Sequence, residues 1–353
     1  MGKLVILIIA VSAFSFILSN PGNKSYEFPS LTFFPAMPTN PNNPVTKKGA
    51  ELGKYLFYDS ILSSDNNMAC ATCHKQKYAF SDSPNKFTRG RNNSLMKRNT
   101  MPLFNLAWYP SYFWDGKANS IEEQIFHPVR DKNEMNLSWK YAEDRIKKSK
   151  FYEKLFKQSF GKTPIDSILI SKAIAQFLRT LISCRSKYDL VLEKKMKFTA
   201  DEYEGFVLIN DQTKGDCLHC HTTDGNALGT TGKFSNNGID KVEKTNEFID
   251  IGRGGITGKT EDNGKFKIPS LRNLVFTAPY MHDGRFSTIE EVVEFYSSGV
   301  KKSPTIDPKM EYAHQGGVQL SKDEKRKIVA FLKTLSDSSF ILNPEFRNPF
   351  KIK

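Results

Sequence analysis

The sequence predicts a mainly α-helical protein built from two similar domains joined by long ordered loops. Its 353 residues suit two domains of ordinary size better than one. A short amphipathic helix, a turn and a Cys-x-x-Cys-His segment follow one another twice, and the two histidines lie 147 residues apart, at positions 74 and 221. This spacing indicates duplication of a whole domain. Strand signals are few, so helices and loops account for most of the chain.

Three helices can be predicted before and between these segments. Residues 50–57 and 201–208 form the two amphipathic helices that precede them. Residues 164–183 form a longer helix with Pro164 near its first turn, where proline is tolerated. The residues expected on its apolar face are Ile168, Ala173, Ile174, Phe177, Leu178 and Leu181.

Two more helices are predicted near the C-terminus by their N-terminal signals. Thr288, followed three residues later by Glu291, opens a helix that ends near Tyr296. Ser321 and Glu324 form a capping box that opens the last predicted helix. The residues expected on its buried face are Ile328, Phe331, Leu332 and Leu335.

The N-terminus reads as a targeting segment. Lys3 is followed by about 15 mostly apolar residues, so residues 1–19 are expected to be a secretory signal peptide, with an uncleaved membrane anchor as the alternative. Residues 20–44 are rich in Pro and Asn and form a linker or wrapping arm. Residues 45–190 and 191–345 are the predicted N-terminal and C-terminal domains. We therefore expect an exported, periplasmic protein that contacts a membrane only if the first segment is uncleaved.

Composition excludes several other classes. The aromatic content of 12% is too high for a disordered chain, and five cysteines are too few for a disulfide scaffold. The formal net charge of +13 does not predict nucleic-acid binding, because no basic helix or aromatic-basic module accompanies it. A lysine-rich solvated surface, or docking of an acidic protein partner, accounts for the charge.

Both Cys-x-x-Cys-His segments match the attachment sequence of c-type haem. The two thiols bond to the haem vinyl groups, and the histidine that follows ligates the iron. A Cys₄ zinc site is the alternative, but it leaves both histidines unexplained, and so does a disulfide. The attachment cysteines are Cys70, Cys73, Cys217 and Cys220, and the proximal histidines are His74 and His221. Cys184 is expected to be a buried inert thiol, and His219 a solvated residue.

Further segments extend the pattern over residues 45–340. They are Ala79-Phe80-Ser81-Asp82, Phe113-Trp114-Asp115-Gly116-Lys117, Glu122-Glu123-Gln124, Asn133-Glu134-Met135, Arg179-Thr180-Leu181, Pro269-Ser270-Leu271-Arg272-Asn273 and Thr277-Ala278-Pro279-Tyr280-Met281-His282-Asp283-Gly284-Arg285. Together with the two Cys-x-x-Cys-His segments, their order and spacing resemble the bacterial di-haem cytochrome c peroxidase/MauG family. The resemblance implies two cytochrome-c-like helical domains with one covalent c-type haem each. It also implies a calcium ion between them.

The resemblance also implies roles for single residues. His74 becomes the proximal ligand of the peroxide-reactive N-terminal haem, and Glu134 the general acid-base that moves a proton of bound H₂O₂. Gln124 matches a glutamine near the same pocket, and Trp114 a tryptophan between the haems. The C-terminal haem, ligated by His221, would take electrons from a small c-type cytochrome.

The family's calcium ligands are an asparagine side chain and two backbone carbonyls. By position these correspond to Asn99, Thr277 and Pro279, with Asn105 as the alternative asparagine. A set of oxygen ligands suits a hard cation such as calcium. The resemblance leaves a homodimeric assembly open.

The chain departs from the classical pattern at both haems. No histidine occurs between His74 and His127, so the N-terminal haem lacks the usual distal histidine and is expected to be open. Classical members place a methionine fourteen residues after the residue equivalent to His282, and here that position is Tyr296, as in the MauG branch. Met281 is the alternative sixth ligand.

These features support three functional hypotheses. The first is a peroxidase that reduces H₂O₂ to water. The second is a MauG-like oxidase that modifies a residue of a partner protein. The third is a simple electron-transfer cytochrome, which Glu134 and the missing second ligand of one haem disfavour.

Overall fold

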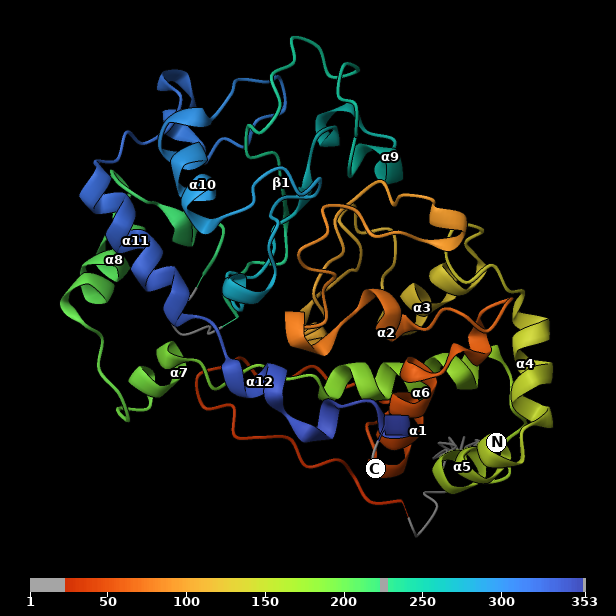
Figure 1. The fold of residues 1–353 in the computed structure, drawn as a ribbon. Helices are drawn as coiled ribbons and strands as arrows, with labels where there is room; N and C mark the ends of the chain where they lie inside the picture. The colour runs from red at the N-terminus through yellow and green to blue at the C-terminus, as the bar shows by residue number, and fades with distance from the viewer. Residues whose placement is uncertain (1–22, 223–227, 352–353) are drawn as a thin grey trace, which may run out of the picture.

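The computed structural model describes residues 23–222 and 228–351, and it is mainly helical, as predicted (Figure 1). The predicted signal peptide, residues 1–19, lies outside the described residues. Strands β1 (Phe234–Ser235) and β2 (Phe266–Lys267) form a short antiparallel ladder. The α-helices are α1 (Lys47–Tyr58), α2 (Cys70–Cys73), α3 (Ile121–Arg130), α4 (Trp139–Lys148), α5 (Lys150–Phe160), α6 (Ser167–Thr180), α7 (Lys187–Leu192), α8 (Ala200–Asn210), α9 (Gly254–Thr257), α10 (Ile289–Glu294), α11 (Lys322–Thr334) and α12 (Ser338–Leu342).

The first hydrophobic core is built around α1, α3 and α6, with α4 and α5 on its outer side (Figure 1). Helix α1 crosses α6 so closely that a methyl group at Gly53 would overlap the backbone carbonyl of Ala173. The C-terminal end of the chain returns to this core, because Phe340 of α12 and Phe346 are buried in it. Helix α1 and the segment around α12 therefore stabilise one core together.

The second core repeats this arrangement around α8, α10 and α11. Helix α8 crosses α11 so closely that a methyl group at Gly205 would overlap the carbonyl of Lys327. The first and second halves of the chain are the parts built around the first and the second core. In each half, the helix that carries the glycine is the last α-helix before a Cys-x-x-Cys-His segment. The duplication predicted from the sequence is thus also a duplication of helix packing.

The predicted helices are present, with three differences. Helix α6 begins at Ser167 after its N-cap Asp166, so Pro164 precedes the helix and does not lie in its first turn. Ile168 is 57% exposed and is not part of the apolar face. Helix α10 ends at Glu294 and continues as a π-helical turn, Phe295–Gly299. The predicted capping box of Ser321 and Glu324 is confirmed at the start of α11.

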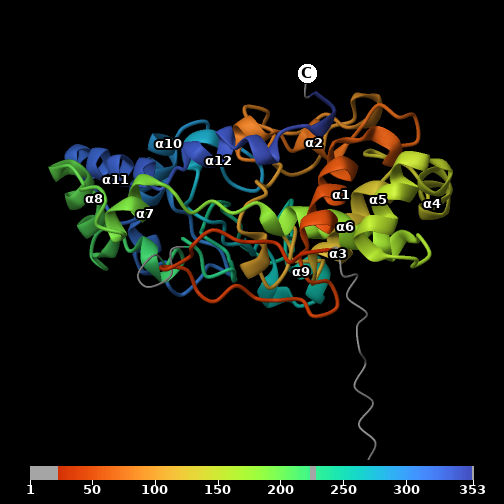
Figure 2. The ribbon, with the colours of Figure 1, turned by 90° about the horizontal axis from the view of Figure 1, so that it is seen from below.

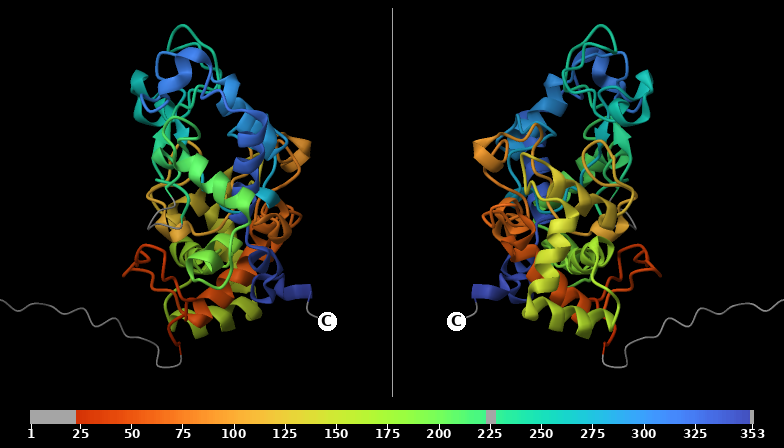
Figure 3. Two further views of the ribbon diagram at one scale, coloured as in Figure 1. Left: turned by 90° about the vertical axis from the view of Figure 1, so that its left-hand side faces the viewer. Right: turned by 90° about the vertical axis from the view of Figure 1, so that its right-hand side faces the viewer.

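The segment before α1 lies along the outside of the helices (Figures 2 and 3). The Asn43 amide donates to the carbonyl of Lys172 in α6 and to the Glu122 carboxylate of α3, at 3.0 and 2.7 Å. The Trp108 indole donates to the carbonyl of Pro35 at 3.0 Å. These hydrogen bonds tie the segment to the first half. Within the described ranges, no helix is long and apolar enough to cross a bilayer.

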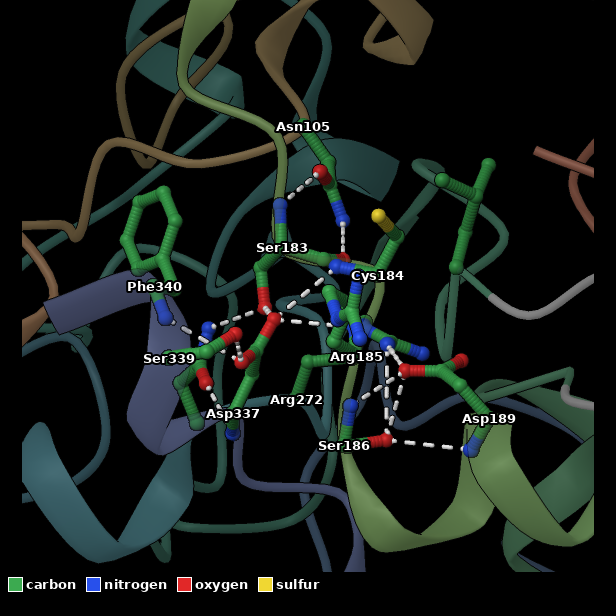
Figure 4. Close-up of polar contacts among 12 residues, drawn as sticks. Asn105, Ser183, Cys184, Arg185, Ser186, Asp189, Arg272, Asp337, Ser339 and Phe340 are labelled. Carbon is green, nitrogen blue, oxygen red and sulfur yellow. Dashed lines mark hydrogen bonds and ion pairs between the residues drawn. The ribbon is translucent and has the colours of Figure 1, made fainter. Parts of the chain in front are cut away.

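A buried polar cluster joins the two halves (Figure 4). The Asp337 carboxylate accepts hydrogen bonds from the Ser183 hydroxyl and from the backbone amides of Cys184 and Arg185, at 2.9–3.4 Å. Nearby, the fully buried guanidinium of Arg272 forms an ion pair with Asp189. Buried charges are retained when they are paired in this way, so the cluster fixes the junction between the cores.

Candidate functional site

The first Cys-x-x-Cys-His segment presents a histidine suited to metal ligation. Cys70 and Cys73 form the single turn of α2, and His74 follows directly. His74 Nδ1 lies 2.7 Å from the carbonyl oxygen of Phe80, which can only accept, so Nδ1 carries the proton. This hydrogen bond leaves Nε2 available for iron, in the way that second-shell partners orient ligating histidines.

The second segment repeats this geometry. His221 Nδ1 donates to the carbonyl of Pro269 at 2.9 Å, so its Nε2 is also available. Burial lowers the pKa of both histidines, and that of His221 to about 4, so both imidazoles are neutral. Neutral imidazole is the form that binds metals. Both histidines therefore fit the proximal role.

The zinc and disulfide alternatives do not fit. None of the five cysteines is paired in a disulfide. In residues 23–222 and 228–351, no three His, Cys, Asp or Glu side chains are grouped closely enough to hold a metal ion. The two Cys-x-x-Cys-His segments thus form separate sites, as covalent attachment of two haems requires.

A cavity extends from the second segment to the predicted sixth ligands. Its walls include Cys217, Cys220 and His221, and also Met281 and Tyr296. Most of the lining is apolar, which suits a porphyrin. Both candidate axial ligands therefore face the same cavity as the proximal histidine.

Tyr296 reaches this cavity from the π-helical turn after α10. Such turns are rare and are frequently found at functional sites. The Tyr296 carbonyl accepts a hydrogen bond from the Val318 amide at 3.2 Å. Gly317 approaches the same carbonyl so closely that a side chain at position 317 would overlap it. Burial raises the pKa of Tyr296 to about 12, and a hydrogen bond from Asn237 acts in the opposite direction.

A second repeat, with an offset of 168 residues, relates residues 105–128 of the first half to residues 273–296 of the second half. Asn105 and Asn273 both have positive φ, and the Tyr112 and Tyr280 hydroxyls donate to equivalent carbonyls at 2.9 and 2.8 Å. Ser120 and Thr288 are the N-caps of α3 and α10. The sequence-based prediction did not use this repeat, although it is visible as Asn-Leu, Tyr, Asp-Gly and Ile-Glu-Glu at constant offset.

The repeat shows why the two haem sites differ. Phe113 corresponds to Met281, and both residues have positive φ, 67° and 73°. Pro128 of α3 corresponds to Tyr296. In the first half, the positions of both candidate sixth ligands therefore hold side chains without a ligating atom.

Trp114 lies at the contact between the halves. Its indole donates to the backbone carbonyl of Asn99 at 2.8 Å, and the backbone amide of Asn99 donates to the backbone carbonyl of His282 at 2.7 Å. Trp114 is buried and also lines the cavity of the second half. Its carbonyl accepts from the Lys267 amide at 2.7 Å. Trp114 is thus held by hydrogen bonds at the wall of the cavity of the second half.

Two charged residues near Trp114 were not predicted from the sequence. Lys267 is buried, its ammonium donates to the carbonyl of Ser111 at 2.8 Å, and burial lowers its pKa to about 7. Arg98 bridges Asp115 of the first half and Asp250 of the second, at 2.6 and 2.7 Å. The Lys267–Ser111 and Arg98–Asp250 contacts join residues 156 and 152 positions apart, so no local signal marks them.

Glu134 and Gln124 lie in the first half, after and within α3. Burial, and then the charge of Asp131, raise the pKa of Glu134 to about 7. Glu134 is also close enough to raise the thiol pKa of Cys70 and Cys73, after the larger effect of burial. The charge of Glu134 therefore acts on the first haem-attachment segment. Gln124 is half-buried in α3, and its role stays a prediction.

The three residues predicted to bind calcium line the same cavity. Asn99, Thr277 and Pro279 all line the cavity of the second half. Asn105 is buried, and both ends of its carboxamide are paired with the Ser183 backbone, at 2.9 and 3.1 Å. The geometry therefore favours Asn99 over Asn105 as the asparagine ligand.

The remaining cysteine and histidine predictions concern Cys184 and His219. Cys184 is buried, and burial raises its pKa to about 12, as expected of an inert thiol. His219 is partly exposed, and its Nδ1 lies 2.9 Å from the Asp216 carboxylate. Neither residue lines the cavity of the second half.

Comparisons with known proteins agree with this site. Residues 47–197 match the family model described as di-haem cytochrome c peroxidase. The methylamine utilization protein MauG of Methylorubrum extorquens is 35% identical over 297 residues, covering 83% of this chain and 79% of that protein. The cytochrome c551 peroxidase of Nitrosomonas europaea is 34% identical over 326 residues, covering 89% of this chain and 86% of that protein.

A solved structure gives the same result. A MauG-like protein associated with microbial copper homeostasis superposes with a TM-score of 0.82 at 29% identity, covering 93% of this chain and all of that one. The identities extend over both halves, and family membership implies two c-type haems. The chain belongs to the di-haem cytochrome c peroxidase/MauG family.

Proposed function

We propose that the protein is a periplasmic di-haem peroxidase that reduces H₂O₂ to water with electrons from a small c-type cytochrome. The main support is the asymmetry of the two sites. Phe113 and Pro128 provide no sixth ligand at the first site, and the charge of the partly buried Glu134 carboxyl acts on the attachment cysteines of that site. An open iron beside a proton-transfer group suits peroxide, whereas a plain electron carrier fills both axial positions.

The protein holds its cofactors with few residues. Cys70, Cys73 and His74 would bind the N-terminal haem, and Cys217, Cys220 and His221 the C-terminal haem. When bound, the haems supply the redox chemistry, in which two electrons and two protons convert one H₂O₂ into two waters. Asn99, Thr277 and Pro279 offer oxygen atoms for a calcium ion that would stiffen the contact between the halves.

Glu134 is the proposed proton-transfer group. A carboxylate there would take a proton from one oxygen of peroxide and return it to the other oxygen, which leaves as water. The two electrons and two further protons then convert the remaining oxygen into the second water. A pKa of about 7 suits both steps, because the group is then neither too weak a base nor too weak an acid. Trp114, fixed by Asn99 and Lys267 between the halves, is the proposed path for electrons.

The second candidate is a MauG-like oxidase acting on a partner protein. Tyr296 in the cavity favours it, and so does the likeness to the MauG protein of Methylorubrum extorquens and to the MauG-like protein associated with copper homeostasis. The test is steady-state peroxide reduction by the purified ferric holoprotein with reduced cytochrome c as donor. Sustained turnover supports the peroxidase, whereas peroxide consumption only in the presence of a modifiable partner protein supports the oxidase.

A further inference from the structure

We propose that Asn237 is a positioning residue that selects Tyr296 over Met281 as the axial ligand of the C-terminal haem. This inference rests on the axial role of Tyr296 within the function proposed above. The observation behind it is that a single side-chain amide contacts both candidate ligand atoms.

Asn237 lies two residues after β1 and lines the same cavity. Its Nδ2 lies 2.9 Å from the Tyr296 hydroxyl oxygen and 3.7 Å from the Met281 sulfur. A thioether sulfur has no proton to donate, so the NH₂ end of the amide must face it. The same NH₂ group therefore donates one hydrogen toward each candidate.

The two contacts differ in strength. The contact to the phenol oxygen has the length of a good hydrogen bond, whereas a thioether sulfur is a weak acceptor. The stronger bond fixes the tyrosine ring in one orientation. The weaker contact occupies the sulfur of Met281 with a donor, which disfavours its use as a ligand.

The loop around Asn237 is anchored by buried hydrogen bonds. The neighbouring Asn236 is fully buried, and its amide donates to the hydroxyls of Ser303 and Thr305 at 2.8 and 3.0 Å. The side-chain oxygen of Asn236 accepts a hydrogen bond from the backbone amide of Gly238 at 3.0 Å, and the Gly238 carbonyl accepts one from the backbone amide of Lys301 at 2.8 Å. Asn237 is therefore held in place before either ligand is engaged, and its amide can direct the choice between them.

Asn237→Leu keeps the approximate size and removes the donor. In the ferric holoprotein, we expect a phenolate-to-iron charge-transfer band in the wild type. In Asn237→Leu, a thioether-to-iron band should appear, with the thioether fraction raised on the order of tenfold, because a hydrogen bond to one competitor is lost. The midpoint potential of this haem should become less negative, because a thioether stabilises ferric iron less than a phenolate does.

Two further variants keep the test decisive. Asn237→Asp also lacks the donor and should shift ligation in the same direction, so it replaces Asn237→Leu if that variant does not fold. Asn237→Leu combined with Met281→Leu removes the sulfur and should show no thioether band. Absorption and resonance Raman spectra of the resting protein report these states without any turnover.

The outcomes separate the two proposals. A phenolate band in the wild type that stays unchanged, with an unchanged potential, in both Asn237 variants overturns the role of Asn237 and leaves Tyr296 as the ligand. A thioether band in the wild type overturns both the axial role of Tyr296 and this inference. Peroxidase activity is measured separately, so its absence would contradict the proposed reaction and not the ligand assignment.

Discussion

Pro128 and Tyr296 occupy corresponding positions in the two halves, 168 residues apart. Pro128 lies within α3, and Tyr296 lies on the π-helical turn that continues α10. Both helices begin at a hydroxyl N-cap, Ser120 or Thr288, with two glutamates in the first turn. One duplicated scaffold thus presents a potential oxygen ligand at one site and an inert ring at the other.

Replacement of the proximal histidines should have unequal effects. His74→Ala should abolish peroxide turnover, because the first half carries the open site. His221→Ala should block electron entry from cytochrome c while peroxide still binds. Steady-state assays with reduced cytochrome c and peroxide-binding spectra distinguish these effects. Full activity in His74→Ala would mean that the roles of the two halves are reversed.

Glu134→Gln keeps the size of the side chain and removes the base. We expect the reaction with peroxide to slow by roughly 10²–10⁴, the usual contribution of general acid-base catalysis. Since the pKa of Glu134 is raised to about 7, the carboxylate form increases as the pH rises through 7. The wild-type rate should therefore rise over this range, and the variant should lack that rise. A wild-type rate independent of pH, or an unimpaired variant, would assign proton transfer elsewhere, with His127 as the next candidate.

Tyr296→Met should make the potential of the C-terminal haem less negative. An anionic oxygen ligand stabilises ferric iron more than a thioether does, so its loss favours the ferrous form. A redox titration of the holoprotein measures the shift, and Tyr203→Met is a control because Tyr203 is exposed on α8. The same potential in both variants would show that Tyr296 does not bind the iron.

Gly205→Ala should destabilise the second half. The added methyl group would overlap the Lys327 carbonyl where α8 crosses α11, and overpacking of this kind costs about 1–3 kcal/mol. Gly255→Ala is the matched control, because its nearest neighbours are the side-chain atoms of Ile251 at 3.3 and 3.4 Å. Thermal unfolding compares the two variants. Equal melting temperatures would show that the α8–α11 crossing can widen without cost.

Removal of calcium should loosen the contact between the halves. Treatment with a chelator should lower the melting temperature and slow electron transfer to the first half, and added calcium should restore both. Asn99→Ala should show the same losses without recovery, because the asparagine side-chain ligand is gone. Mass spectrometry of the native protein that finds no calcium, together with no effect of the chelator, would contradict the site.

Local chemistry in the sequence determined the class of this protein. The Cys-x-x-Cys-His segments contain both thiols and the proximal ligand within five residues, so they identify the haem sites without any knowledge of the fold. Helix starts such as Ser321 with Glu324 are equally local, because a cap involves residues three positions apart. These features could be predicted because each depends only on near neighbours.

Only the tertiary structure decided the environment of these groups. Asn237 is hydrogen-bonded to Tyr296, which lies 59 positions later in the sequence. Phe340, near the C-terminus, packs in the first core. The raised pKa of Glu134 results mainly from burial, which the local sequence does not determine. Burial and hydrogen bonds between distant residues arise only when the whole chain packs, and for that reason the sequence alone indicated Tyr296 and Met281 as alternatives but did not show the amide that lies between them.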